Sequence, residues 1–397
     1  MKTLSATFAL LLLISCSGED PATSDTGSTQ DSGTDTGSDT GTDTGTEVEM
    51  ESLEFATYNM GLAVGYVPYA EARLEETTAA AVAIEADVLC IQEVWTEEHV
   101  EYVSTQLATS FPHVHYEYVQ EEITGEPPCT IEEGIPLQEC AIENCSEATD
   151  LATCVLENCA VEFFGTSESC QGCLGANIGL NDLEAIVVAC TQAAATTTYG
   201  GHQGLILASK HPIENESYTE FDGFLVARGM LYAEIQGVQI VCTHLSSRLS
   251  TTYSGDHESY QGENLYQMDT IRAVLDGKDP NKPQIIMGDF NAGPALGDDI
   301  AGELEDNYQT LEADGYVCAN TASETPFCTW CADNLLINDP TNNAIDHVMV
   351  RYAETSNPRR LLDTPITVET EDAPGGSAEV NLSDHFGLQA TVSWPKD

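Results

Sequence analysis

The sequence predicts a mixed α/β (α+β) fold in which a two-layered β-sandwich is flanked by helices and carries an inserted, disulfide-rich helical subdomain. Three observations predict this arrangement: strands alternate with helices early in the folded region, strands come in pairs later, and cysteines crowd between residues 121 and 198. The length of 397 residues is ample for one large domain with a sizeable core.

Early in the folded region, the hydrophobic pattern switches between the period of two that is typical of strands and the longer period that is typical of helices. The expected elements are a strand at 53–58 that ends at Asn59, a helix at 73–86, a strand at 87–92 that leads into Glu93, a helix at about 97–109 and a strand near 115–119.

Later in the chain, apolar runs follow one another with short connections, which favours paired strands. The expected elements are a strand at 205–209, a hairpin of 230–236 and 238–243 around Gly237, a helix at 263–275, an apolar strand before Asp289, a strand around 345–350 and a last strand that ends near Trp394.

Eight cysteines lie in the segment 121–198, and an even set in an exported chain predicts a disulfide framework. They are Cys129, Cys140, Cys145, Cys154, Cys159, Cys170, Cys173 and Cys190. Several lie in stretches rich in Ala, Glu and Leu, so we expect an inserted helical subdomain held by disulfides. Zinc is the alternative, because Cys170-Gln171-Gly172-Cys173 has the spacing of metal ligands.

The N-terminus predicts export. An apolar run from Phe8 to Ile14 is too short to span a bilayer and fits a signal peptide over residues 1–15. Leu13-Ile14-Ser15-Cys16 resembles a bacterial lipoprotein box, in which Cys16 becomes the lipidated first residue. Plain secretion is the alternative. Residues 16–50 are Ser, Thr, Asp, Gly and Glu for the most part and predict a disordered, acidic tether that holds the domain away from the membrane of the cell envelope, at the outer membrane or the cell surface.

The charge balance argues against tight binding to long nucleic acids. The chain has 12 Lys+Arg against 66 Asp+Glu, a net charge of -54, and no Lys or Arg between Arg73 and Lys210. Proteins that bind duplexes normally gain affinity from basic side chains, so this surface would need bridging metal ions. The acidity also fits a solubility or high-salt adaptation without functional content.

The stretch from Ile285 to Pro294 is the most informative one for chemistry. Its apolar run ends at Gly288, and Asp289 and Asn291 then point to the same side because side chains at i and i+2 share a face. A carboxylate there can hold a metal ion or orient its water, and an amide can hold an oxygen. Asp and Asn at strand ends also cap helices and turns, which is the structural alternative.

Polar side chains also follow or adjoin the other predicted strands, in the same sense along the chain. The full set is Asn59, Glu93, His244, Asp289, Asn291, Asp346, Asp384 and His385. If the strands share a sheet, these groups converge at one edge. Carboxylates, amides and histidines suit a hard divalent cation and an anionic oxygen substrate.

The order of these motifs resembles the endonuclease/exonuclease/phosphatase superfamily of metal-dependent phosphoesterases. The matching pieces are Ala56-Thr57-Tyr58-Asn59, Ile91-Gln92-Glu93-Val94, Leu207-Ala208-Ser209-Lys210-His211-Pro212-Ile213, Thr243-His244-Leu245, Gly288-Asp289-Phe290-Asn291, Ile345-Asp346-His347 and Ser383-Asp384-His385. The resemblance covers about 53–119 and 202–394. It implies a four-layer fold for a domain at 51–397, interrupted by the insert at 121–198.

The resemblance also implies roles. Glu93 would be the main ligand of Mg²⁺ (or Mn²⁺ or Ca²⁺), with Asn59 beside it and Asp384 as a further metal-binding or water-positioning carboxylate. Asp289 would orient or deprotonate the attacking water, and Asn291 and His244 would hydrogen-bond the phosphate. His385 would contact the phosphate or act as a base, with its tautomer fixed by Asp346.

Other histidines and cysteines receive structural interpretations. His202, His211 and His347 fill no catalytic position of the family. Cys90 and Cys242 are expected to be small core residues. Cys318, Cys328 and Cys331 are expected to include one further disulfide, which leaves one thiol unassigned.

Local features are most similar to the sphingomyelinase-type phosphodiesterase branch, such as Trp95 after Gln92-Glu93-Val94 and the long polar loop after Thr243-His244-Leu245. We therefore expect a membrane-tethered, metal-dependent phosphodiesterase that acts on a phospholipid head group. The alternatives are an extracellular nuclease and an inactive fold that serves as a surface binding module.

Overall fold

The structure is a computed structural model that describes residues 49–396, with gaps at 121–122, 124, 146–150, 178–182, 250–252 and 254. The predicted signal peptide, Cys16 and all but the end of the predicted tether lie outside the described residues. Within the described ranges, no helix has both the length and the apolar character that crossing a membrane requires.

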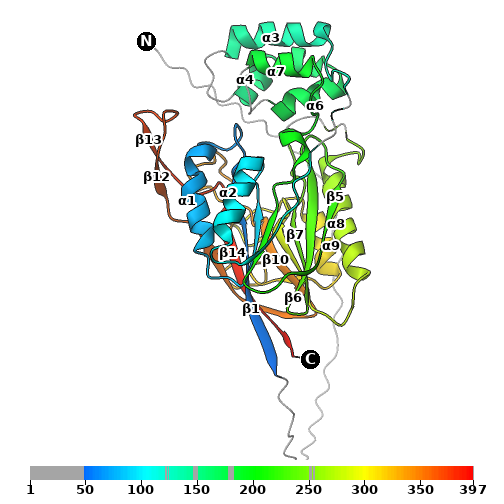
Figure 1. Cartoon of the computed structure of the whole chain (residues 1–397), viewed down its shortest axis with the longest axis vertical. Coiled ribbons are helices and arrows are strands. Elements are labelled where there is room, and N and C mark those ends of the chain that lie inside the picture. The colour runs from blue at the N-terminus through cyan, green and yellow to red at the C-terminus, as the bar shows by residue number, and fades with distance from the viewer. Residues whose placement is uncertain are drawn as a thin grey trace, which may run out of the picture. The chain divides into compact units, whose positions relative to one another are not determined.

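Two six-stranded sheets dominate the described part of the chain (Figure 1). The first has the spatial order β11 (Glu354–Leu361), β14 (Gly387–Pro395), β1 (Met50–Asn59), β2 (Val88–Gln92), β4 (Ile206–Ser209), β3 (His113–His115). The second has the order β5 (Glu214–Phe221), β6 (Arg228–Ile235), β7 (Val238–His244), β8 (Gln284–Asp289), β10 (Asp346–Arg351), β9 (Val317–Cys318). β1 and β2 are parallel, as are β7 and β8, whereas their other neighbours are antiparallel. A small sheet of β12 (Ile366–Glu369) and β13 (Ser377–Val380) completes the described strands.

Helices cover the outer face of each sheet, which gives the expected four layers (Figure 1). They are α1 (Ala70–Val82) and α2 (Glu97–Leu107) on the first sheet, and α8 (Tyr260–Asp276) and α9 (Glu305–Ala313) on the second. Helix α2 begins where the Thr96 side chain accepts a hydrogen bond from the His99 N–H, and acidic residues occupy its first turn. Its buried Val100, Val103 and Leu107 form one apolar face.

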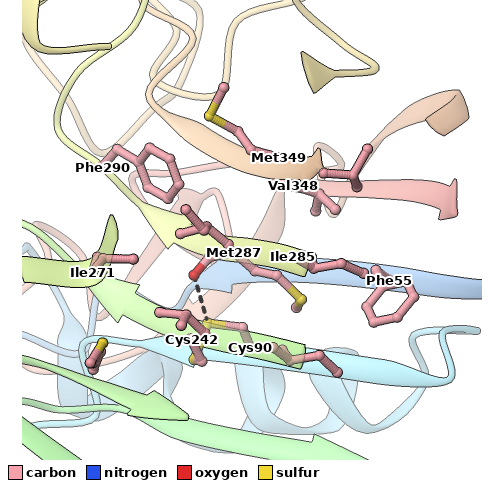
Figure 2. Close-up of a cluster of buried hydrophobic side chains, with 14 of the residues drawn as sticks. Phe55, Cys90, Cys242, Ile271, Ile285, Met287, Phe290, Val348 and Met349 are labelled. Carbon is pink, nitrogen blue, oxygen red and sulfur yellow. Dashed lines mark hydrogen bonds between the residues drawn. A yellow bond between two sulfur atoms is a disulfide. The ribbon is translucent and has the colours of Figure 1, made fainter. Parts of the chain in front are cut away.

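Strand β2 lies between two apolar cores and is therefore buried on both faces. In β2, Val88 and Cys90 point to the core between the sheets, whereas Leu89 and Ile91 point to the core beneath α1 and α2. This follows from the alternation of side chains along a strand. Figure 2 shows the core between the sheets, where Phe55 and Met287 lie among other apolar side chains.

Cys90 and Cys242 are buried core residues, as expected, but they also form a disulfide that was not predicted (Figure 2). Cys90 lies in β2 of the first sheet and Cys242 in β7 of the second, with their Cα atoms 5.4 Å apart. Both side chains point inward at the same level, so the bond ties the two sheets together across 152 residues of sequence.

The cysteine-rich insert consists of short helices: α3 (Ile131–Cys145), α4 (Leu151–Asn158), α5 (Ala160–Phe164), α6 (Glu168–Asn177) and α7 (Leu183–Cys190). Its disulfides are Cys129–Cys170, Cys140–Cys159, Cys145–Cys154 and Cys173–Cys190. The disulfide framework is therefore confirmed. The zinc alternative is wrong, because Cys170 and Cys173 are each bonded to another cysteine. The three later cysteines include one disulfide, as expected: Cys328 pairs with Cys331, which leaves Cys318 free and buried.

Several boundaries differ from the expectations. Helix α1 begins at Ala70 rather than residue 73, and the strand expected near 115–119 lies at His113–His115. The hydrophobic pattern did not indicate β5, β11, β12, β13 or α9. β5 and β11 are edge strands with mostly exposed polar side chains, so they lack an apolar alternation that could be recognised.

Candidate active site

The predicted polar residues meet at one edge of the sandwich. Parallel strands β1, β2, β7 and β8 end there, so Asn59, Glu93, His244 and Asp289 come together. β10 and β14 run in the opposite direction and begin at the same edge. Asp346 and the pair Asp384–His385 therefore join the cluster from the starts of strands.

Asn59 links the two central carboxylates. Its Nδ2 donates to Glu93 Oε1 and to Asp289 Oδ2, each at 3.0 Å. Its Oδ1 accepts a hydrogen bond from the Gly61 N–H at 3.0 Å. In this arrangement Asn59 orients both acids, and its oxygen is already engaged by the backbone.

Glu93 and Asp384 are brought close by unusual backbone at the end of the first sheet. Glu93 has φ 61°, and Gly61 has φ 55°. A Cβ at Gly61 would lie 2.3 Å from Asp384 Oδ1, so only glycine leaves room for this approach. Burial, and next to it the negative charge of Asp384, raises the pKa of Glu93 above its ordinary value.

Asp289 lies at the centre of the cluster. Gly288 lets β8 approach β7 closely, since a Cβ there would lie 1.8 Å from the Thr243 carbonyl oxygen. The Asn291 N–H donates to Asp289 Oδ1 at 2.8 Å, while Oδ2 lies 3.4 Å from His244 Nε2 and 3.7 Å from His385 Nε2. Burial, followed by the charge of Asp346, raises the pKa of Asp289 to about 7.

His244 has a tautomer fixed by Arg228. The Arg228 guanidinium lies 3.3 Å from His244 Nδ1 and can only donate, so Nδ1 accepts and Nε2 carries the proton. Nε2–H then faces Asp289 and lies 3.2 Å from Asn291 Nδ2, which itself donates to the Leu245 carbonyl at 2.9 Å. Burial and the Arg228 charge lower the pKa of His244 well below its ordinary value, which keeps this imidazole neutral.

His385 differs from His244 because it is protonated. Its Nδ1 lies 2.8 Å from Asp346 Oδ2, and its Nε2 points towards Asp289. Burial opposes a charge on this ring, but Asp346 and Asp289 outweigh burial and raise the pKa of His385 well above its ordinary value. The site thus contains one neutral and one protonated histidine, and both direct Nε2 towards the same oxygen of Asp289, Oδ2.

A family model matches residues 56–385, from β1 to His385. The chain belongs to the Endonuclease/Exonuclease/phosphatase family. Members of this family are metal-dependent hydrolases of phosphate esters.

Solved structures show the same fold. Sphingomyelinase C from Streptomyces griseocarneus matches with a TM-score of 0.52 and 17% identity, over 86% of this chain and 99% of that one. Beta toxin from Staphylococcus aureus, in a form with bound magnesium ions, matches with a TM-score of 0.52 and 13% identity, over 86% and 99%. SmcL matches with a TM-score of 0.52 and 13% identity, over 86% and 98%. No curated protein matches this sequence.

The family cluster fits a divalent cation. Possible ligand atoms of Glu93, His244 and Asp289 lie within 4.8 Å of one another, and those of Asp289, Asp346 and His385 do the same. The carboxylates are the donors to an ion, because His244 and His385 both carry a proton on the nitrogen that faces Asp289. The raised pKa values of Glu93 and Asp289 show that buried negative charge is crowded here. A bound cation would relieve this crowding, and carboxylate oxygens are the donors that Mg²⁺ and similar hard ions prefer.

Sequence reasoning did not identify Arg228, which is buried between His244 and the ring of Trp95. The signal was available in principle: Arg228 is the first residue of β6, and Gly229 pairs with His244. His202 and His347 are buried outside the cluster; His347 Nε2 lies 2.9 Å from the Ala292 carbonyl. His211 is half-exposed, and its Nδ1 contacts the Gln236 amide at 3.2 Å.

Proposed function

We propose that this chain is an exported, Mg²⁺-dependent phosphodiesterase that acts on a phospholipid head group of the sphingomyelin type. The observation that carries the proposal is the buried cluster around Asp289. It combines a crowded set of acids with one neutral and one protonated histidine, which is a site for an anionic oxygen substrate and its metal ion.

In the proposed reaction, Glu93 and Asp384 would hold the ion, and Asn59 keeps Glu93 and Asp289 in position. When bound, the ion supplies Lewis-acid polarisation of the phosphate and stabilises charge on the leaving oxygen. Asp289 accepts a proton from the attacking water, for which a pKa of about 7 is well suited near neutral pH.

The two histidines act as donors to the phosphate. His385, held by Asp346, donates through Nε2 and carries a positive charge, so its hydrogen bond strengthens as negative charge develops. His244, held by Arg228, donates through Nε2 without adding charge. Asn291 lies beside it and offers a further amide donor.

Two observations favour a lipid head group over a nucleic acid. The chain has 12 Lys+Arg against 66 Asp+Glu, so there is little positive surface for a polyanion, whereas a lipid head group offers one phosphate. The neighbours named sphingomyelinase C and beta toxin are also matched over 99% of their length.

The test is an assay of the domain from Leu53 with Mg²⁺ and then with EDTA. Phosphocholine release from sphingomyelin vesicles is measured beside cleavage of single- and double-stranded DNA, with Glu93→Gln as the matched control. We expect metal-dependent lipid turnover that the substitution abolishes, with inert DNA. If DNA is cleaved and the lipid is not, the chain is instead a secreted nuclease. If the unsubstituted domain hydrolyses neither substrate, phosphomonoesters are the substrates to test next.

We also propose that Cys16 is lipidated and anchors the domain to the cell envelope. The disulfides among the described residues support export, because such bonds persist in oxidising compartments. In a bacterial host, the full chain should incorporate labelled palmitate and sediment with membranes. Cys16→Ser should lose the label, and a soluble, unlabelled wild type would contradict the anchor.

A further inference from the structure

A short loop closed by a disulfide lies against the Asp346–His385 pair. Cys328 is bonded to Cys331, three positions further along, and encloses only Thr329 and Trp330. Thr329 is fully buried and Trp330 is half-buried. Thr329 hydrogen-bonds to the Asp346 backbone and Trp330 contacts the His385 ring, so the loop contacts both members of the pair.

Thr329 fixes the backbone on both sides of the pair. Its Oγ1 accepts hydrogen bonds from the Asp346 N–H at 3.1 Å and the Ile345 N–H at 3.2 Å. Its carbonyl accepts from the Phe386 N–H at 2.8 Å. Asp346 begins β10 and Phe386 precedes β14, so this one residue sets the spacing between two strands that belong to different sheets.

Trp330 packs on the imidazole itself. The two rings are in an edge-to-face arrangement, with centroids 5.1 Å apart and planes at 69°. His385 is therefore held at Nδ1 by Asp346 and on its ring by Trp330. The Trp330 backbone is anchored in turn, because its N–H and carbonyl both hydrogen-bond to Asn343.

Arg360 joins the disulfide to the same segment. Its guanidinium lies 3.9 Å from Cys328 Sγ and 3.7 Å from Cys331 Sγ, and it covers the Phe386 ring at 4.7 Å. Just beyond the loop, Asn334 Nδ2 donates to the Ser383 carbonyl at 2.9 Å. The chain around the disulfide thus holds the segment that carries Asp384 and His385 at several points.

We propose that the Cys328–Cys331 loop is a positioning element that holds the Asp346–His385 pair in register for catalysis, with Thr329 and Trp330 as its positioning residues. The inference rests on the proposed function of that pair. A disulfide across three positions leaves the enclosed backbone little freedom, and small displacements of a catalytic group cost large factors in rate.

The first test removes the bond. In the full chain, Cys328→Ser with Cys331→Ser should lower kcat by about 10- to 100-fold while KM stays within about twofold. The matched control is Cys145→Ser with Cys154→Ser, which opens a disulfide of the insert and should leave kcat unchanged. Equal kcat losses in both variants would overturn the proposal, since they would show a general effect of unfolding.

The second test separates the two contacts. Thr329→Ser keeps the hydroxyl and should retain the wild-type kcat. The isosteric Thr329→Val should lower kcat by about the same factor as the loss of the Cys328–Cys331 disulfide. Trp330→Phe keeps an aromatic ring and should lose less than Trp330→Ala. A Thr329→Val protein as active as Thr329→Ser would contradict the role of the hydroxyl and with it the proposal.

A measurement without turnover makes the outcome independent of the substrate. The Nδ1 proton of His385 is expected as a downfield NMR resonance, assigned by its absence in His385→Gln, that reports the bond to Asp346. Opening the Cys328–Cys331 bond should shift or broaden this resonance, and opening Cys145–Cys154 should not. An unchanged resonance overturns the loop's role.

The same set distinguishes failure of the loop from failure of the proposed function. If Asp346→Asn and His385→Gln keep full hydrolysis, the catalytic role of the pair is wrong, and the loop's role in catalysis falls with it. If these two lose activity while the loop variants match the wild type in kcat and resonance, only the loop inference is wrong.

Discussion

The sandwich and the cysteine-rich insert are stabilised in different ways. The sandwich has an apolar core between its sheets and a second core beneath α1 and α2, built largely from side chains that are fully buried. The insert has one small cluster in which cysteines supply many of the members, and it leaves apolar residues such as Ile131 and Val161 exposed at 61% and 82%. Short helices around so small a core bury too little surface, and disulfides make up the difference.

The difference matters for the active site. A cluster of buried acids is unfavourable for folding, as the raised pKa values of Glu93 and Asp289 show. The proposed catalytic residues all belong to the sandwich, whose large, continuous core can hold such groups in place. Among the described residues, the insert contacts the region of the site through Gly175, whose carbonyl accepts a hydrogen bond from the Tyr66 hydroxyl. Tyr199, just after the insert, stacks on Trp95 with ring centroids 5.2 Å apart.

The largest effect is expected from Asp289→Asn. Because the amide cannot accept the proton from water, hydrolysis should fall by about 10³- to 10⁴-fold. The thermal midpoint should hold or rise, since a buried charge is removed. Steady-state kinetics and a melt monitored by circular dichroism provide the check. A large loss of stability together with activity would show that Asp289 supports the sandwich rather than the chemistry.

The next effect concerns the two cores directly. Phe55→Ala empties a fully buried position between the sheets and should lower the free energy of unfolding by about 3–5 kcal/mol. Phe163→Ala in the insert should cost roughly 1–2 kcal/mol, because its cluster is small and also held by disulfides. Urea unfolding with matched m-values gives both losses in free energy of unfolding. Equal losses would show that the two regions depend on apolar burial to the same extent.

The third prediction concerns the Cys173–Cys190 disulfide of the insert. Cys173→Ala with Cys190→Ala opens a bond between residues 17 positions apart and should cost the insert about 3 kcal/mol. Limited proteolysis should then cut between residues 129 and 190. Trp95, Trp330 and Trp394 all lie outside the insert, so tryptophan fluorescence should show the sandwich unfolding as in the wild type. If the fluorescence showed a matching loss of stability, the sandwich and the insert would fold as one unit.

The last prediction concerns a difference in acid sensitivity. Burial lowers the pKa of His347 to about 4, below the ordinary value of 6.5. Between these values the unfolded chain binds a proton that the folded chain does not. The contribution of His347 to the stability of the sandwich is therefore fully present above pH 6.5 and is lost, by up to about 3 kcal/mol, as the pH drops to 4. Fluorescence-monitored unfolding across this range gives the slope, and His347→Gln should reduce it.

The insert has no histidine, so it provides the contrast. Hydrogen bonds from Thr130 and Ser167 lower the pKa of Glu133 to about 2, from an ordinary 4.5. This contribution is present above pH 4.5 and is lost only as the pH falls towards 2. Protease resistance of the insert should thus persist at pH 5, where the sandwich has begun to weaken. An insert that is cleaved at pH 5 would contradict this order.

Much of the site could be predicted because strand ends are visible in a sequence. Asn59, Glu93, His244 and Asp289 each follow an apolar run, and parallel strands that share an edge bring such positions together. Arg228 was missed because it lies just before the apolar run that was predicted as the strand 230–236. The hairpin predicted around Gly237 already places the start of β6 beside the end of β7, where Gly229 pairs with His244.

The disulfide between Cys90 and Cys242 was missed for a related reason. Alternation indicates that each side chain is buried, but it does not tell which of the two cores a buried residue faces. The insert bonds were predictable as a set and not as pairs, because Cys140–Cys159 and Cys145–Cys154 depend on how α3 packs against α4 and α5.

The place where the insert joins the sandwich has an evolutionary consequence. It lies in the chain between β3 and β4, which are antiparallel neighbours, with His115 opposite Leu207. The insert thus stands where an ordinary hairpin turn would suffice. An insertion at this position can be gained, lost or replaced during evolution without changing the order of any strand. The insert and the sandwich can therefore diverge in sequence at different rates.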